Sequence, residues 1–150
     1  MSMSSRSQVQ MRQGVSSLNI GVGLVVLGGV VGFIFSFLHW YGVTPHGGST
    51  MFLNGWHGWG FPASIIFIVA ALIGLGRLAG LAVGPAATEA GLLVVLGVAA
   101  VVCTIIFMVT EGNGYGAGFS KGPLYGAWVG LICGIVIALG GLLTPRTTTI

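Results

Sequence analysis

Four apolar runs, each about twenty residues long and almost free of charge, constrain this chain more than any other feature. They cover residues 19–40, 61–78, 91–110 and 124–143. At 1.5 Å per residue, a helix of about twenty residues crosses the roughly 30 Å hydrocarbon core of a bilayer. Because lipid offers the backbone no hydrogen-bond partners, each run is expected to be a membrane-spanning helix. The sequence therefore predicts an all-α polytopic membrane protein with four antiparallel transmembrane helices.

The composition excludes the common soluble classes of protein. Of 150 residues, 55% are hydrophobic and 28 are glycine, while only five are basic and two are acidic. A soluble domain normally carries about a quarter of its residues as charges. Five scattered cations form no basic patch, so nucleic acid is not an expected partner. Cys103 and Cys133 both lie inside apolar runs and form no C-x-x-C motif.

The polar segments predict how the chain is divided and how it is oriented. Residues 1–18 are expected to be a polar tail, residues 19–143 a single four-helix domain, and residues 144–150 a second tail. Lys121 lies in a loop between the third and fourth runs, whereas the other four cations lie in the tails or near the middle connection: Arg6, Arg12, Arg77 and Arg146. Basic residues favour the cytoplasmic side. We therefore expect a multi-pass protein of the plasma (inner) membrane with both termini cytoplasmic.

Small residues recur every four positions on the last and first runs. The two stripes consist of Gly126, Gly130, Gly134 and Ala138, and of Gly28 and Gly32. Such a stripe leaves a flat groove in which another helix backbone gains close dispersion contacts. Two interpretations are open: packing between the first and fourth helices of the same bundle, or docking of a second protein.

Ionisable residues are predicted at helix ends rather than in the middle of the runs. Arg77, Glu89, Glu111 and Lys121 all fall at such ends, where they are expected to set helix boundaries, with Arg77 reaching the interface. Catalysis or proton-coupled transport in a bilayer generally needs an ionisable group at depth. The sequence therefore predicts a protein that is not an enzyme and that carries no cofactor.

The two longer loops, which this topology places outside, are rich in aromatic residues. We expect an exposed aromatic surface there, formed by Trp40, Tyr41, Phe52, Trp56, Trp59, Tyr115 and Phe119. Aromatic side chains suit the depth of the lipid head groups.

Three histidines, His39, His46 and His57, belong to the same predicted outer face. Imidazole is the commonest metal ligand, so a metal- or haem-binding redox subunit is one alternative. The spacing lacks an H-x-x-x-H pattern, and the loop from Tyr41 to Gly60 holds no Asp, Glu or Cys. Interfacial or loop roles are therefore the expected ones.

Three segments carry a resemblance to a known group of proteins: Trp40-Tyr41, the run from Asn54 to Gly58, and Gly126-Ala127-Trp128. In these features, over about residues 20–143, the chain resembles small four-span proteins that are common in actinobacterial membranes. Some of those are accessory subunits of envelope assemblies, including lipid importers of the Mce type and respiratory complexes. The resemblance implies a partner and no catalytic residue.

These observations predict a non-catalytic accessory, assembly or stabilising subunit. Its expected surroundings are the lipid bilayer and either a larger membrane complex or further copies of itself. A second alternative is a protein that binds lipid or another small apolar molecule in a cleft below the outer loops.

Overall fold

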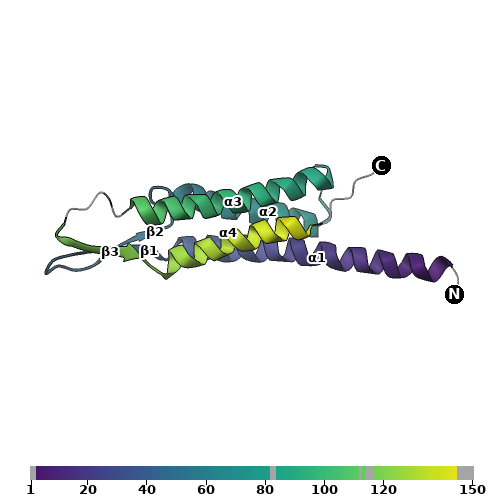
Figure 1. Ribbon diagram of the computed structural model, residues 1–150, viewed down its shortest axis with the longest axis horizontal. Helices are drawn as coiled ribbons and strands as arrows, with labels where there is room; N and C mark the ends of the chain where they lie inside the picture. Colours follow the sequence, from purple (N-terminus) through teal and green to yellow (C-terminus); the bar gives the residue numbers. More distant parts are fainter. Residues whose placement is uncertain (1–2, 82–83, 112, 114–116, 145–150) are drawn as a thin grey trace.

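The computed structural model describes residues 3–81, 84–111, 113 and 117–144. In chain order the elements are α1 (Met3–Ser36), β1 (His39–Pro45), β2 (Met51–Asn54), α2 (Gly60–Leu78), α3 (Ala86–Thr110), β3 (Phe119–Pro123) and α4 (Tyr125–Leu143). Figure 1 shows the helices lying along one long axis, with the strands gathered at one end and α1 extending past the other. We call these the sheet end and the opposite end of the bundle.

The small sheet corrects the all-α prediction. β1 lies between β2 and β3 and is antiparallel to both, so that Val43 is opposite Met51 on one side and Lys121 on the other. The first apolar run was expected to remain helical up to Trp40, but α1 ends at Ser36. The reason is visible in the segment His39–Pro45, whose aromatic and β-branched residues suit a strand once the neighbouring β2 and the distant β3 supply partners.

Long apolar helices make this a helical membrane protein. Within the described part of the chain, Gly60–Leu78, Thr88–Thr110 and Tyr125–Leu143 are long and apolar enough to cross a membrane, and Ile20–Ser36 is a shorter apolar stretch of α1. Large apolar side chains such as Leu72, Val95 and Ile132 point away from the bundle and are exposed. A water-soluble protein would bury most of this surface, whereas lipid solvates it.

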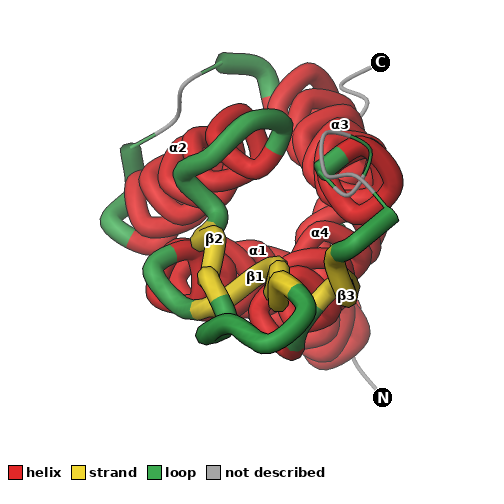
Figure 2. The backbone as a smooth tube through the Cα atoms, turned by 90° about the vertical axis from the view of Figure 1, so that its left-hand side faces the viewer, coloured by secondary structure: helices red, strands yellow, loops and turns green. Residues whose placement is uncertain are grey.

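The four helices form a ring in which each packs on two neighbours. α1 lies between α2 and α4, and α3 closes the ring on the other side (Figure 2). Glycines set the close approach: a Cβ on Gly29 would lie 2.7 Å from the Ala71 nitrogen of α2, and one on Gly21 would lie 2.8 Å from the Gly140 carbonyl oxygen of α4. This backbone contact is typical of helices packed in membranes.

The predicted polar tail is also helical. α1 begins at Met3 and continues without a break into the apolar part that starts at Ile20. In Figure 1 this first stretch projects beyond the other helices at the end of the bundle opposite the sheet.

Candidate functional site

Trp40 is the centre of the sheet end, and it is fully buried. Its indole Nε1–H donates a hydrogen bond to the Phe35 carbonyl at 2.8 Å, and its ring meets Phe107 edge-on at a centroid distance of 5.5 Å. A Cβ on Gly126 or Gly130 would lie 2.6 or 2.8 Å from the indole. These two glycines of the α4 stripe therefore leave the slot that the indole fills, and the prediction of an exposed Trp40 is wrong.

Tyr41 and Val43 of β1 are buried between the sheet and the helix bundle. Tyr41 packs edge-on against Phe107 at 6.2 Å, so its expected place on an exposed surface is also wrong. Burial raises the pKa of Tyr41, and the nearby charge of Glu111 raises it further. The Glu111 carboxylate lies against Gly58, where the positive φ of 48° and the lack of space favour glycine.

The part of the α4 stripe farther from the sheet, Gly134 and Ala138, faces α3. A Cβ on Gly134 would lie 2.9 Å from the Val101 side chain, and Ala138 packs directly on Gly97. Trp40 covers the part of the stripe nearer the sheet end, so every member of the stripe contacts another part of this chain. The sequence left open whether the stripe packs on the first helix of the same bundle or on a second protein; within this chain it contacts Trp40 and α3 rather than α1.

The α1 stripe is divided between two helices. A Cβ on Gly28 would lie 2.9 Å from the Ile137 side chain and 3.0 Å from the Cys133 carbonyl of α4. One on Gly32 would lie 2.7 Å from the Phe67 ring of α2. Only part of the expected contact between the first and fourth helices is therefore made by these glycines.

Exposed apolar side chains remain at the sheet end, and β2 carries two of them in succession. Met51 is 66% exposed and Phe52 is 52% exposed, while Trp59 and Phe119 are also exposed. Trp56 is half-buried, with its ring 5.4 Å from that of Phe37. Of the predicted aromatic surface, Tyr115 lies outside the described residues. Of the predicted set, Phe52, Trp59 and Phe119 are therefore exposed, Trp56 is half-buried, and Trp40 and Tyr41 are buried.

The two edges of the sheet differ in chemistry. β3 carries Lys121 and Pro123, a charge and a residue without an N–H, and both discourage pairing with another strand. β2, with the sequence Met-Phe-Leu-Asn, carries neither. In the sheet of described strands, β2 has a neighbour on one side only, which is β1. The edge without a charge or a proline is therefore also the edge that carries the more exposed apolar side chains, Met51 and Phe52.

The histidines lie in separate local contacts. His39 Nδ1 is 3.4 Å from the Tyr125 hydroxyl, and its ring lies 4.2 Å from that of Phe52. His57 Nδ1 is 2.9 Å from the Asn54 Oδ1, and the His46 backbone N–H bonds to the Gly118 carbonyl. Among the described residues, no group of three His, Cys, Asp or Glu side chains is placed to hold a metal ion.

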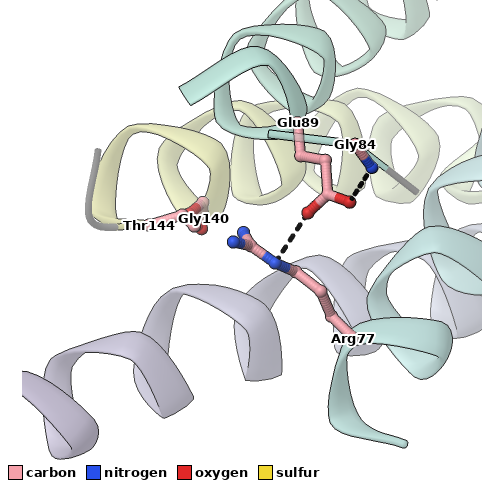
Figure 3. Close-up of polar contacts among 5 residues, drawn as sticks. All are labelled: Arg77, Gly84, Glu89, Gly140 and Thr144. Atoms are coloured by element: carbon pink, nitrogen blue, oxygen red, sulfur yellow. Dashed lines mark hydrogen bonds and ion pairs between the residues drawn. The ribbon is translucent and has the colours of Figure 1, made fainter. Parts of the chain in front are cut away.

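A buried ion pair at the opposite end was not predicted. Arg77 Nε, in the last turn of α2, lies 2.8 Å from Glu89 Oε2 in the first turn of α3, with the side chains only 12% and 3% exposed. The Gly84 N–H donates to Glu89 Oε1 at 2.9 Å. Figure 3 shows the guanidinium directed between Glu89 and the end of α4 that carries Thr144. The Arg77 side chain is therefore directed to Glu89 within the bundle, and each of the two charges lies at the helix end whose dipole favours it.

Searches of protein-family models and of curated proteins gave no match to this sequence. The geometry of the two bundle ends, and of the sheet in particular, is therefore the basis for a functional argument.

Proposed function

We propose that the protein spans the membrane four times, with both termini and the Arg77–Glu89 pair on the cytoplasmic side. The apolar stretch of α1, Ile20–Ser36, would cover about 26 Å as a helix, close to a hydrocarbon core. It lies alongside α4, whose end is level with Gly21. The excess of arginine in the tails and near the α2–α3 connection supports this orientation.

We propose further that this protein is a non-catalytic accessory subunit that binds a partner protein through the sheet, outside the membrane. One observation carries the proposal: the unprotected edge of β2 coincides with the exposed Met51 and Phe52. An edge strand offers backbone N–H and C=O groups to an added strand, and its exposed side chains supply specificity. The glycine stripes support the same conclusion, because their use inside the bundle leaves the sheet as the better docking surface.

Site-specific photo-crosslinking in native membranes tests this proposal. A photoreactive phenylalanine analogue replaces Phe52 on β2 or, as the matched control, Phe119 on β3, since both are exposed aromatic residues on edge strands. We expect a discrete crosslinked protein from position 52 and far less from position 119. Equal labelling at both positions, or crosslinks to lipid alone, would contradict docking at β2.

A second function, binding of an apolar molecule, is supported by a recess between α1 and α2. It has a volume of about 210 Å³ and is lined by Val30, Phe33, Ile68, Ala71 and Leu72. Each of these residues is apolar, so the recess suits an acyl chain rather than a polar ligand. A photoreactive lipid that labels the wild type but not an Ala71→Leu variant, which fills the recess, would support this second function. Labelling that ignores the substitution would exclude this recess as the binding site.

A further inference from the structure

Two hydrogen bonds show which backbone groups of β1 point toward β3. The Leu124 N–H donates to the Trp40 carbonyl at 2.8 Å, and the His46 N–H donates to the Gly118 carbonyl at 3.0 Å. Both bonds join directly opposite residues, because each pair continues the register that holds between β1 and β3. The backbone groups of successive strand residues point to alternate sides. The even-numbered residues of β1 therefore face β3, and the odd-numbered ones face β2.

This alternation leaves the Phe52 N–H and C=O on the free edge of β2. Tyr41 and Val43 of β1 are opposite Leu53 and Met51, so these two residues of β2 direct their backbone groups toward β1. Phe52 lies between them, and its backbone groups point the other way. Within the described part of the chain, no hydrogen bond to either group is present. A free donor and a free acceptor on one exposed residue are the groups with which an added strand pairs.

The side chains on either side of Phe52 indicate the chemistry of such a strand. Directly opposite residues lie on the same face of a sheet, so Met51 and Leu53 share the face of the buried Val43 and Tyr41. An antiparallel strand bonded to Phe52 would place the two residues that flank its own bonded residue beside Met51 and Leu53, in closely spaced pairs. These two flanking residues are therefore expected to be apolar.

A second copy of this chain in the same membrane would not supply that strand. Figure 1 shows the strands extending away from the helices roughly along the long axis of the bundle. Two copies inserted in the same direction would present their β2 strands in the same direction, whereas an antiparallel pair needs opposite directions. A parallel pair related by a two-fold axis would put both Phe52 residues at one level, whereas a parallel ladder needs an offset of one residue.

We propose that the partner docks by adding one antiparallel strand to β2, hydrogen-bonded to the Phe52 N–H and C=O. The added segment belongs to a different protein and carries apolar residues on both sides of the residue that pairs with Phe52. That central residue is not proline, because it must donate an N–H. This inference rests on the docking at β2 proposed above, and it names the kind of segment that docks there.

Removal of a single backbone N–H tests the pairing without changing a side chain. Phenyllactic acid, the hydroxy-acid analogue of phenylalanine, replaces Phe52 in the full chain, and the partner protein retained in native nanodiscs is quantified. We expect binding to weaken about fivefold, because one hydrogen bond of the ladder is lost. The same analogue at Phe119, an exposed phenylalanine on the opposite edge strand, is the matched control and should retain the partner as the wild type does.

Mass spectrometry of the photo-crosslink formed at position 52 identifies the docked segment. We expect one peptide of a different protein, in which two apolar residues flank a residue other than proline. A peptide from β2 of a second copy, or a peptide with charged residues at the flanking positions, would overturn the proposal.

The docking at β2 and the addition of a strand fail in different ways. If position 52 forms no discrete crosslink to a protein, docking at β2 is wrong, and strand addition is wrong with it. If the crosslink forms but the partner is retained equally with phenyllactic acid at positions 52 and 119, docking at β2 stands and strand addition is wrong.

Discussion

The two ends of the helix bundle are closed by different interactions. At the sheet end, the Trp40 indole fills a slot left by Gly126 and Gly130 and packs on Phe107. At the opposite end, the Arg77–Glu89 pair joins α2 to α3. The stability of an apolar packing contact depends on the volume and shape of the side chains, whereas the stability of an ion pair depends on both charges being present. The two ends are therefore expected to respond to different kinds of substitution.

Trp40→Ala is expected to have the largest effect on stability. Removing a fully buried indole leaves a cavity under the sheet and should lower the free energy of unfolding by about 3–5 kcal/mol. Thermal unfolding in detergent, followed by circular dichroism, measures this change. Trp128→Ala is the matched control, since Trp128 is 54% exposed on the outside of α4 and should cost much less. Similar losses of unfolding free energy in the two variants would show that the buried Trp40 indole does not stabilise the sheet end.

Glu89→Gln is expected to come next, with a loss of about 3 kcal/mol. The substitution leaves the largely buried Arg77 charge without its counterion. A double-mutant cycle with Arg77→Met measures the pairing, because the double variant should lose less than the sum of the two single variants. Strict additivity would contradict a direct interaction between these two side chains.

Gly130→Ala is expected to cost about 1–3 kcal/mol, because the added methyl group overlaps the Trp40 indole. Gly23→Ala on α1 is the control, since a Cβ there meets no described atom within 4 Å. That control should be neutral or slightly stabilising, as alanine has the higher helix propensity. The same unfolding measurement compares the two variants. If Gly23→Ala were the more damaging one, the packing of the sheet end would be misassigned.

The smallest expected effect concerns the ionisation of Tyr41. Its raised folded-state pKa favours the neutral phenol, so this contribution to stability is complete below about pH 10 and is lost as the pH rises through the folded pKa. Glu111→Gln should move the Tyr41 pKa back toward 10 without reaching it, because burial is the larger cause. Absorbance titration at alkaline pH, with Tyr41→Phe to assign the signal, measures the shift. A higher Tyr41 pKa in Glu111→Gln than in the wild type would contradict this electrostatic effect of Glu111.

The sequence predicted the helices better than it predicted either end of the bundle. The expected runs 61–78 and 124–143 closely match α2 and α4, because an uninterrupted apolar run has one stable backbone solution in lipid. The strands were missed because β1 pairs with the remote β3 as well as with the neighbouring β2, and local sequence carries little information about the remote partner. Trp40 was misplaced for the same reason, since its burial depends on Gly126 and Gly130.

The candidate site was predictable only in part. The aromatic loop residues predicted an exposed aromatic surface, and Phe52, Trp59 and Phe119 are exposed at the sheet end of the bundle as expected. The unprotected edge of β2 depends on the pairing of strands, so a pattern of residue types does not reveal it. One signal in the sequence could have predicted the Arg77–Glu89 pair. Arg77 lies in the last turn of α2 and Glu89 in the first turn of α3, and a short connection joins the two helices.

Extraction into native nanodiscs, followed by identification of the retained proteins, tests docking through β2 most directly. Wild type is compared with Phe52→Lys and with Phe119→Lys, which place the same charge on opposite edges of the sheet. We predict a companion protein in constant proportion that persists with Phe119→Lys and is lost with Phe52→Lys, while both variants unfold at the wild-type temperature. A wild-type chain found without a companion, or one whose companion survives Phe52→Lys, would contradict the account.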